Sequence, residues 1–270
     1  MNMKKTLLWV VLLAACSFSA KAQTLIDVQF GGNDYGSPGV VQTGVGLIGS
    51  SGDQWNNFTS DSALISGVSL VDSTGASTGA TLTVAGTPGG GYSYGQLYMY
   101  ADGVNPGNPN GPNQLSANGS SVGNLASSEL GNSTSLTLSL TGLTANTTYD
   151  LYMLSAPDRW ERSSSWSLNG GTAQTVGPMN SYVGPLSNYP TYGWAPYEPV
   201  SGINYLLLTG TSDSSGNLTL SGTSISGDAD INGFQLQAVA AVPEPSSYVL
   251  ILAGVFALII FQRKRASKLA

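Results

Sequence analysis

The 270-residue chain contains no histidine, a single cysteine and, between its two ends, almost no basic residues. Without histidine there is no Ser-His-Asp triad, no Cys-His pair, no HExxH zinc site and no imidazole general base. The lone cysteine, Cys16, excludes a disulfide framework and a cysteine-rich metal site. We therefore expect a protein that is not an enzyme. A glycoside-active enzyme is the least favoured alternative, because no pair of carboxylates stands out by its spacing.

Charged residues make up only 9% of the chain, and they are unevenly placed. Seven of the nine basic residues lie in the end segments, which leaves Arg159 and Arg162 in the body. Fourteen acidic residues lie in that same body, so its net charge is −12. Nucleic-acid binding requires a basic face that displaces counterions, and no such face can form here.

Residues 1–22 are predicted to form a secretory signal peptide, with two lysines, an apolar run and then small residues. Ala20 and Ala22 form an A-x-A cleavage site, which places the mature N-terminus at Gln23 and makes signal peptidase a processing partner. A second interpretation stays open, because the residues that end at Cys16 resemble a lipobox whose cysteine would be acylated. The apolar run is too short for a membrane-spanning helix, which needs about 20 residues.

The C-terminal residues 242–269 have three parts in a fixed order. A proline-flanked motif comes first, formed by Val242, Pro243, Glu244, Pro245 and Ser246. An apolar segment over 247–262 follows, predicted to be a transmembrane helix, and a basic stop then ends it, formed by Arg263, Lys264 and Arg265. The uninterrupted apolar stretch of this segment, Tyr248 to Phe261, would rise about 21 Å as a helix. The hydrocarbon core of a membrane is about 30 Å thick, so the segment is a marginal anchor. The basic stop predicts that the body lies outside the membrane.

This order closely resembles the PEP-CTERM sorting signal, also described as an ice-binding protein C-terminal domain. The resemblance implies recognition by exosortase, a membrane-embedded cysteine transpeptidase-like enzyme. It also implies a protein anchored in the inner membrane before processing and released afterwards to the cell surface or extracellular matrix. Members of this family are associated with extracellular polysaccharide, which makes such a polysaccharide a candidate partner.

The body, residues 23–241, is predicted to be one all-β domain. Apolar and polar residues alternate with a period of two, turn residues separate the runs, and no helical stripe occurs. The clearest runs are 25–30, 81–84, 92–100, 136–141, 149–154, 204–208, 218–220 and 231–236. About ten short strands over this length are typical of a single antiparallel β-sandwich or jelly roll.

Short phrases of the body resemble jelly-roll domains of the galactose-binding-like or malectin-like kind. They lie at 25–31, 52–56, 142–152 and 231–236. The resemblance implies the sandwich fold. It also motivates the main alternative function, a carbohydrate-binding jelly-roll module for exopolysaccharide.

Aromatic residues gather in one proline-rich segment, residues 177–205, and near the two body arginines. The candidate sugar-stacking residues are Trp160, Tyr189, Tyr192, Trp194 and Tyr197. Two explanations are open: a platform that stacks on sugar rings, or a satellite core that packs on the edge of the sandwich. We favour the satellite core, because nothing in the spacing requires exposure.

Two charged segments are candidate sites. Residues 158–162 hold both body arginines among acids, which favours an ion-pair network over the binding of a sugar hydroxyl or uronate. Asp228, Asp230 and Asn232 match the first half of a calcium loop, D-x-D-x-N-G, but position twelve is Val239 rather than Glu. A turn at the entry to a strand is the favoured explanation, and a calcium site completed by Asp27 is the alternative.

Threonine pairs of the T-x-T type are few and isolated in the sequence. A flat threonine array for ice binding would require a regular repeat, and the chain has none. The sequence therefore gives no sign of an ice-binding face.

Overall fold

A computed structural model of the chain describes most of the body and short pieces of the tail. The described residues are 24–32, 41–60, 65–85, 87–88, 96–101, 125, 128–155, 162–178, 199–239, 254–255, 258–259, 261–262 and 265. The chain divides into two units, Met1–Val239 and Ala240–Ala270. The predicted signal peptide, the Pro-Glu-Pro motif and the aromatic residues Trp160, Tyr189, Tyr192, Trp194 and Tyr197 lie outside the described residues.

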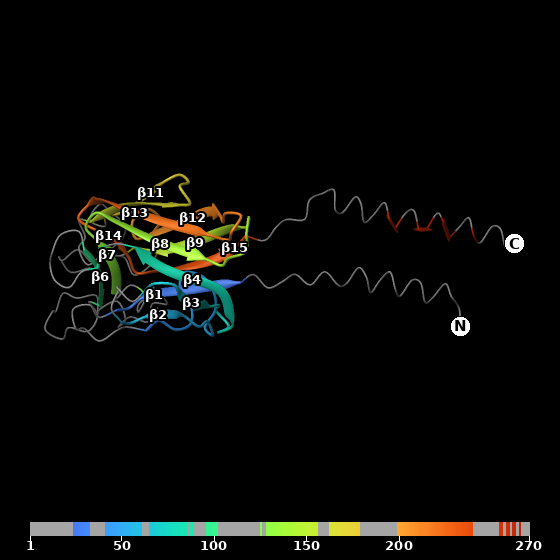
Figure 1. Cartoon of the computed structure of the whole chain (residues 1–270), viewed down its shortest axis with the longest axis horizontal. Coiled ribbons are helices and arrows are strands. Elements are labelled where there is room, and N and C mark those ends of the chain that lie inside the picture. Colours follow the sequence, from blue (N-terminus) through green and yellow to red (C-terminus); the bar gives the residue numbers. More distant parts are fainter. Residues whose placement is uncertain are drawn as a thin grey trace, which may run out of the picture. The chain divides into compact units, whose positions relative to one another are not determined.

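The body consists of two main sheets and one smaller sheet (Figure 1). The first main sheet, sheet A, has the strand order β12-β9-β15-β1-β2. Its strands are β1 (Leu25–Phe30), β2 (Asn56–Phe58), β9 (Thr148–Leu154), β12 (Tyr205–Thr211) and β15 (Gly233–Ala238). All of its pairs are antiparallel except β1 with β2.

The second main sheet, sheet B, has the order β11-β10-β13-β8-β4-β3 and is antiparallel throughout. Its strands are β3 (Val68–Val71), β4 (Ser77–Ala85), β8 (Ser135–Thr141), β10 (Ser163–Leu168), β11 (Gln174–Val176) and β13 (Leu218–Ser226). From β8 to β15 the chain passes back and forth between the two main sheets, with the consecutive strands β10 and β11 both in sheet B and β14 in the small sheet. The pair β4–β8 lies within one sheet, since the chain between them forms part of the small sheet.

The small sheet has the order β14-β7-β6-β5. Its strands are β5 (Thr87–Pro88), β6 (Gln96–Ala101), β7 (Ser128–Asn132) and β14 (Ala229–Ile231). The chain enters β15 directly from β14, so this sheet continues one end of the sandwich.

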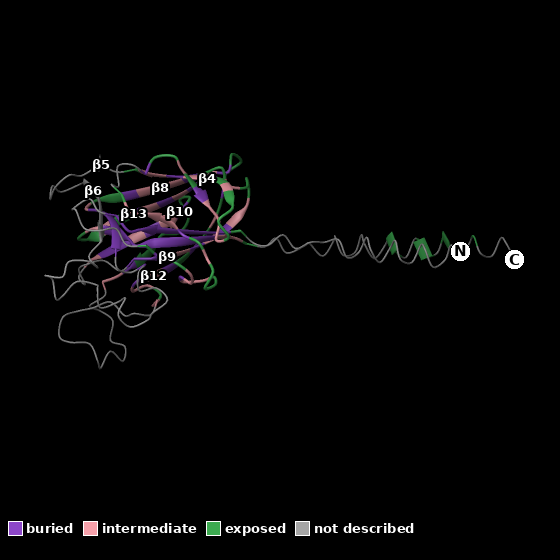
Figure 2. Ribbon diagram, turned by 90° about the horizontal axis from the view of Figure 1, so that it is seen from below, coloured by how far each residue is buried: buried purple, intermediate pink, exposed green. Residues whose placement is uncertain are grey.

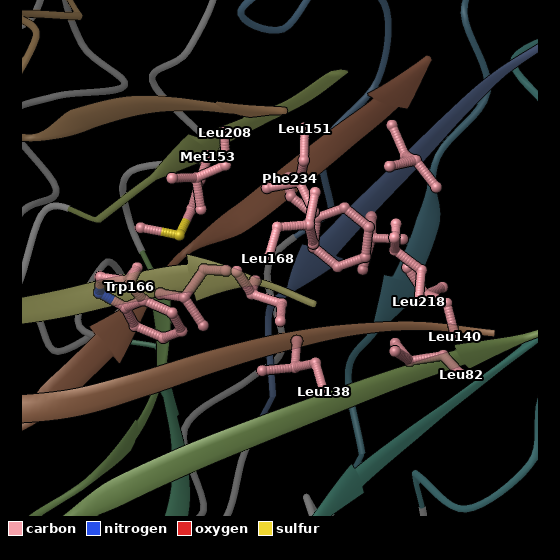
Figure 3. Packing of buried hydrophobic residues seen from close by; sticks show 14 of the residues in the cluster. Leu82, Leu138, Leu140, Leu151, Met153, Trp166, Leu168, Leu208, Leu218 and Phe234 are labelled. Carbon is pink, nitrogen blue, oxygen red and sulfur yellow. The ribbon is translucent and has the colours of Figure 1, made fainter. Parts of the chain in front are cut away.

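Leucine side chains from both sheets meet in one core (Figure 3). Sheet B contributes the alternate residues Leu136, Leu138 and Leu140 of β8, all buried. Leu151 and Phe234 of sheet A belong to the same buried cluster. Figure 2 shows the buried residues gathered along the strands and the exposed ones in turns and on outer faces. Period-two alternation therefore explains which side of each strand is buried.

The prediction of an all-β sandwich is confirmed, but two details were wrong. The described residues contain fifteen strands rather than ten, and two strand pairs are parallel. The extra strands are mostly two to four residues long, too short to show alternation. One predicted strand, residues 231–236, is interrupted at Asn232, where β14 gives way to β15.

The sandwich has one end where the chain enters and leaves it. Leu25 pairs with Gln237, so the first and last strands of the body lie side by side. At the opposite end Leu154 pairs with Gly233 and with Tyr205. We call this opposite end, where Leu154, Gly233 and Tyr205 lie, the loop end.

In the second unit, the described residues are helical and exposed. The guanidinium of Arg265 lies 5.2 Å from the ring centroid of Phe261. Within the described part of the chain, no helix is long and apolar enough to cross a membrane. The predicted transmembrane segment 247–262 stays a prediction.

Gly222 offers a direct test of the packing. It is paired with Trp166 across sheet B, and a Cβ at this position would lie 2.5 Å from the buried indole ring. We expect Gly222→Ala to lower the free energy of unfolding by about 1–3 kcal/mol, because the core has no room for the methyl group. Urea unfolding of the purified full-length chain measures this, with Gly52→Ala as the control, because no atom lies within 4 Å there. Equal stability of the two variants would contradict the packing.

Candidate functional site

Arg162 is the centre of an ion-pair cluster at the loop end. Its guanidinium lies 2.6 Å from a carboxylate oxygen of Asp228, 3.2 Å from Asp230 and 3.4 Å from Glu129. The side chains are 11% exposed for Arg162, 16% for Asp228 and less for the other two. Because a buried charge is costly unless it is paired, this guanidinium offsets part of the cost of burying each carboxylate.

Three strands position the cluster. Arg162 directly precedes β10, Glu129 belongs to β7, and Asp230 belongs to β14. The backbone of Gly227, at φ +74°, passes so close to the arginine stem that a Cβ would meet Cγ at 2.6 Å. Glycine is required there both by the conformation and by the contact. The cluster therefore ties the small sheet to sheet B.

The sequence predicted an ion-pair network around residues 158–162. Arg162, the member of this segment that the structure describes, does form ion pairs. The partners that the structure describes are distant in the sequence, since Glu129 and Asp230 are 33 and 68 residues away. The sequence indicated that Arg162 would be shared by several acids, because the body has so few cations. It did not indicate that the acids would come from other strands.

The calcium candidates lie in different surroundings from those of a calcium loop. Asp230 is part of strand β14, and Asp228 and Asp230 both contact Arg162. Asn232 is buried and donates from Nδ2 to the carbonyl of Ser128. Among the residues described, no group of three acidic, histidine or cysteine side chains is placed to hold a metal. Calcium binding stays a prediction.

A shallow depression accompanies the cluster. It is lined by Ser155, Arg162, Ser163, Ser164, Val176, Gly177, Asp228 and Asp230. The described carboxylates converge on one guanidinium instead of facing each other across a cleft, as two glycosidase carboxylates would. The arrangement holds strand ends together, and a bound sugar hydroxyl would have to compete with existing ion pairs.

A second polar cluster lies under the loop 41–55 on the outer side of sheet A. Asp27 in β1 is fully buried, and its Oδ1 accepts a hydrogen bond of 2.5 Å from Gln235 Nε2. Among the residues that the structure describes, the other oxygen, Oδ2, has no hydrogen-bond partner. The amide of Gln235 also bonds both the N–H and the carbonyl of Ile48 in the loop. One side chain thus joins the buried acid to the loop that covers it.

Hydrogen bonds at two more points hold this loop. The backbone N–H of Gln42 donates to Gln29 Oε1 at 2.6 Å and to Asn57 Oδ1 at 2.9 Å. Trp55 donates from its indole nitrogen to the carbonyl of Gly44 at 2.7 Å. Sequence reasoning did not find this cluster, because glutamine at alternate positions of a strand is normally solvent-exposed.

Burial raises the pKa of the Asp27 carboxyl from 3.8 to about 7. The hydrogen bond from Gln235 acts in the opposite direction, and the carboxylates of Asp53 and Asp72 raise the pKa further. A protonated acid avoids the cost of a buried, unpaired charge. Below pH 7 this group is therefore neutral in the folded protein. Asp27 accepts its hydrogen bond from Gln235, and the calcium site that Asp27 would complete stays a prediction.

No family model matches the chain, and no curated protein matches it. Among solved structures, the ANX2 ectodomain from Arabidopsis thaliana overlaps 45% of this chain and 36% of its own, with 15% identity and a TM-score of 0.29. A β-glucuronidase from Bacteroides uniformis overlaps 55% of this chain and 15% of its own, with 14% identity and a TM-score of 0.31. The chain thus spans about a third of the ectodomain and a smaller share of the glucuronidase.

The raised pKa of Asp27 has a consequence for stability. Because the folded-state pKa of about 7 exceeds the unfolded value of 3.8, the folded protein binds this proton more tightly. The free energy of unfolding should fall as the pH rises from about 4 to 7, by on the order of 2–4 kcal/mol. Asp27→Asn should remove that part of the pH dependence. Urea unfolding at several pH values compares the two proteins, and equal slopes would show that Asp27 is ionised in the fold.

Arg162 is expected to be essential for stability. Arg162→Met removes the guanidinium that three buried or half-buried carboxylates share, which should cost about 3–5 kcal/mol. Adding Asp228→Asn and Asp230→Asn should recover part of that loss, because it removes two of the negative charges that the guanidinium offsets. Chemical unfolding measures both, with Asp213→Asn at an exposed turn as the control. If Arg162→Met is as stable as the control, the cluster makes no net contribution to the free energy of unfolding.

Proposed function

We propose that this chain is an exported, non-enzymatic protein of the cell surface or extracellular matrix, sorted through its C-terminal signal. The observation that carries the proposal is the order of motif, apolar segment and basic stop over residues 242–265. Every part of the PEP-CTERM pattern occurs there in sequence. The resemblance implies exosortase as one processing enzyme and gives the chain an anchored and a released form. The predicted A-x-A site at Ala20 and Ala22 implies signal peptidase as the other.

The extent of the sandwich supports this proposal. Its first strand starts at Leu25, two residues after the predicted mature start at Gln23. Its last strand ends at Ala238, before the motif that begins at Val242. Removal of both signals would therefore take no residue from any of the fifteen strands. A body with this layout can fold before the tail is processed and keep its fold afterwards.

The chemistry of the body supports a role without catalysis. The chain has no histidine, and Arg162 engages the carboxylates of Asp228, Asp230 and Glu129. The body carries a strong negative charge, which disfavours anionic lipid and nucleic acid as partners. A neutral extracellular polysaccharide is the partner most compatible with this charge and with the implied location.

The sorting motif can be tested by substitution. Replacing Pro243, Glu244 and Pro245 together by alanine should leave the protein full-length and membrane-bound in its native host. Fractionation and immunoblotting measure the fate of the chain, and Ser247→Ala is the matched control outside the motif. Normal release of the triple-alanine variant would contradict sorting through this signal. Diacylglycerol on Cys16 would instead contradict the predicted cleavage before Gln23.

A further inference from the structure

The outer face of sheet B carries hydroxyl groups and no charge. The six strands of this sheet contain no Asp, Glu, Lys or Arg. The outward-facing hydroxyl residues are Ser69, Thr81, Thr83, Ser135, Thr137, Ser139, Thr141, Ser165, Ser167, Thr175, Thr219, Ser221 and Thr223, none of which is buried. We call this surface the hydroxyl face.

Strand register places these residues in rows. Thr83, Ser139 and Thr219 form one row across β4, β8 and β13. A second row continues from β8 through β13 to β10, formed by Thr137, Ser221 and Ser167. Neighbouring rows are about 6.6–6.8 Å apart along a strand, and neighbouring strands are about 4.7–4.9 Å apart. The T-x-T pairs that look isolated in the sequence thus combine into a two-dimensional array.

Among the described residues, most of these hydroxyls make no hydrogen bond to another group of the protein. Thr81 and Thr141 bond each other at 2.9 Å, and Thr83 accepts from the N–H of Gly67. Within the part of the chain that the structure describes, the hydroxyls of Thr137 and Ser221 make no hydrogen bond to protein. They face water, so a ligand hydroxyl can replace that water without breaking a contact of the fold.

We propose that the hydroxyl face docks a neutral, hydroxyl-rich polysaccharide. This inference rests on the proposed extracellular location and adds the binding surface. A body charge of −12 repels an anionic polymer, and an uncharged face offers no carboxylate to a cationic one. A hydroxyl group both donates and accepts hydrogen bonds. The hydroxyls of the protein face can therefore bond directly to the hydroxyls of a neutral polysaccharide.

The geometry favours a glycan chain over a rigid surface. An extended chain of pyranose units advances by a length similar to the strand spacing, so successive sugars can lie over successive strands. Sheets twist by about 20–25° per strand, and a flexible polymer can follow this twist. A flat crystal such as ice cannot.

The outer face of sheet A differs from the hydroxyl face in three ways: a loop covers part of it, it carries charge, and its hydroxyls bond within the protein. The loop 41–55 covers it over β1 and β15, where Ile48 bonds Gln235. Asp150 on β9 accepts a hydrogen bond of 2.6 Å from Thr209, so the uncovered part carries charge. Thr148 and Thr211 bond each other at 3.1 Å. This face therefore supplies a matched control for the hydroxyl face.

Affinity gel electrophoresis of the purified full-length chain tests the proposal. The probes are hydroxyethylcellulose and galactomannan, which are neutral, and alginate, which is anionic. The variant replaces Thr137, Thr219 and Thr223 by valine, which removes three hydroxyls while keeping the β-branched shape. The control replaces Thr148, Thr209 and Thr211 on sheet A by valine. Circular dichroism and thermal unfolding confirm that both variants are folded.

We expect at least one neutral polymer, but not alginate, to retard the wild-type protein. The hydroxyl-face variant should bind about tenfold more weakly, and the control should bind normally. A variant with Ser139→Ala and Ser221→Ala is a second test on the same face, should the valine variant fail to fold.

Several results would overturn the proposal. These are no retardation by either neutral polymer, preferential binding of alginate, or unchanged binding by the hydroxyl-face variant. Binding lost only in Trp194→Ala would place the site in the aromatic segment instead. Self-association or ice-growth inhibition that depends on the three threonines, without polymer binding, would also replace it. Tail processing is assayed separately in the host, so a failure of sorting and a failure of docking give different results.

Discussion

The packing of two sheets through alternate residues is the constraint on which the rest of the structure depends. On β8, Leu136, Leu138 and Leu140 pack into the core, so Ser135, Thr137, Ser139 and Thr141 must point outward. The same alternation on β4 and β13 aligns leucines inside and hydroxyls outside. One local pattern therefore produces both the stabilising core and the uncharged outer face.

The two clusters that contain charged or acidic groups lie away from the outer face of sheet B. The Arg162 cluster lies at strand ends, where β7, β10 and β14 meet, and its charges neutralise one another in part. Asp27 lies on the side of β1 away from the core and is covered by a loop that Gln235 holds. Both clusters link segments far apart in the sequence. They stabilise the arrangement of loops and sheets without adding charge to the outer face of sheet B.

Local patterns were sufficient to predict the fold class and its longest strands. Ser135–Thr141 and Thr148–Leu154 are strands because apolar and polar residues alternate along most of their length. Strand β10, with three consecutive serines, shows no such alternation and was missed. The partners of Arg162 and the rows of hydroxyls were beyond sequence reasoning, since they depend on register between strands. A residue's neighbour across a sheet is set by tertiary pairing rather than by its own segment.

The central claim is that the chain is an exported sandwich whose two end segments are removed. The intact mass of the protein isolated from the extracellular fraction of its native host tests this most directly. We expect a chain that starts at Gln23 and ends near Pro243–Pro245, with every strand of the sandwich retained. A mature chain that still contains Phe261, or still begins with residues 1–22, would contradict it.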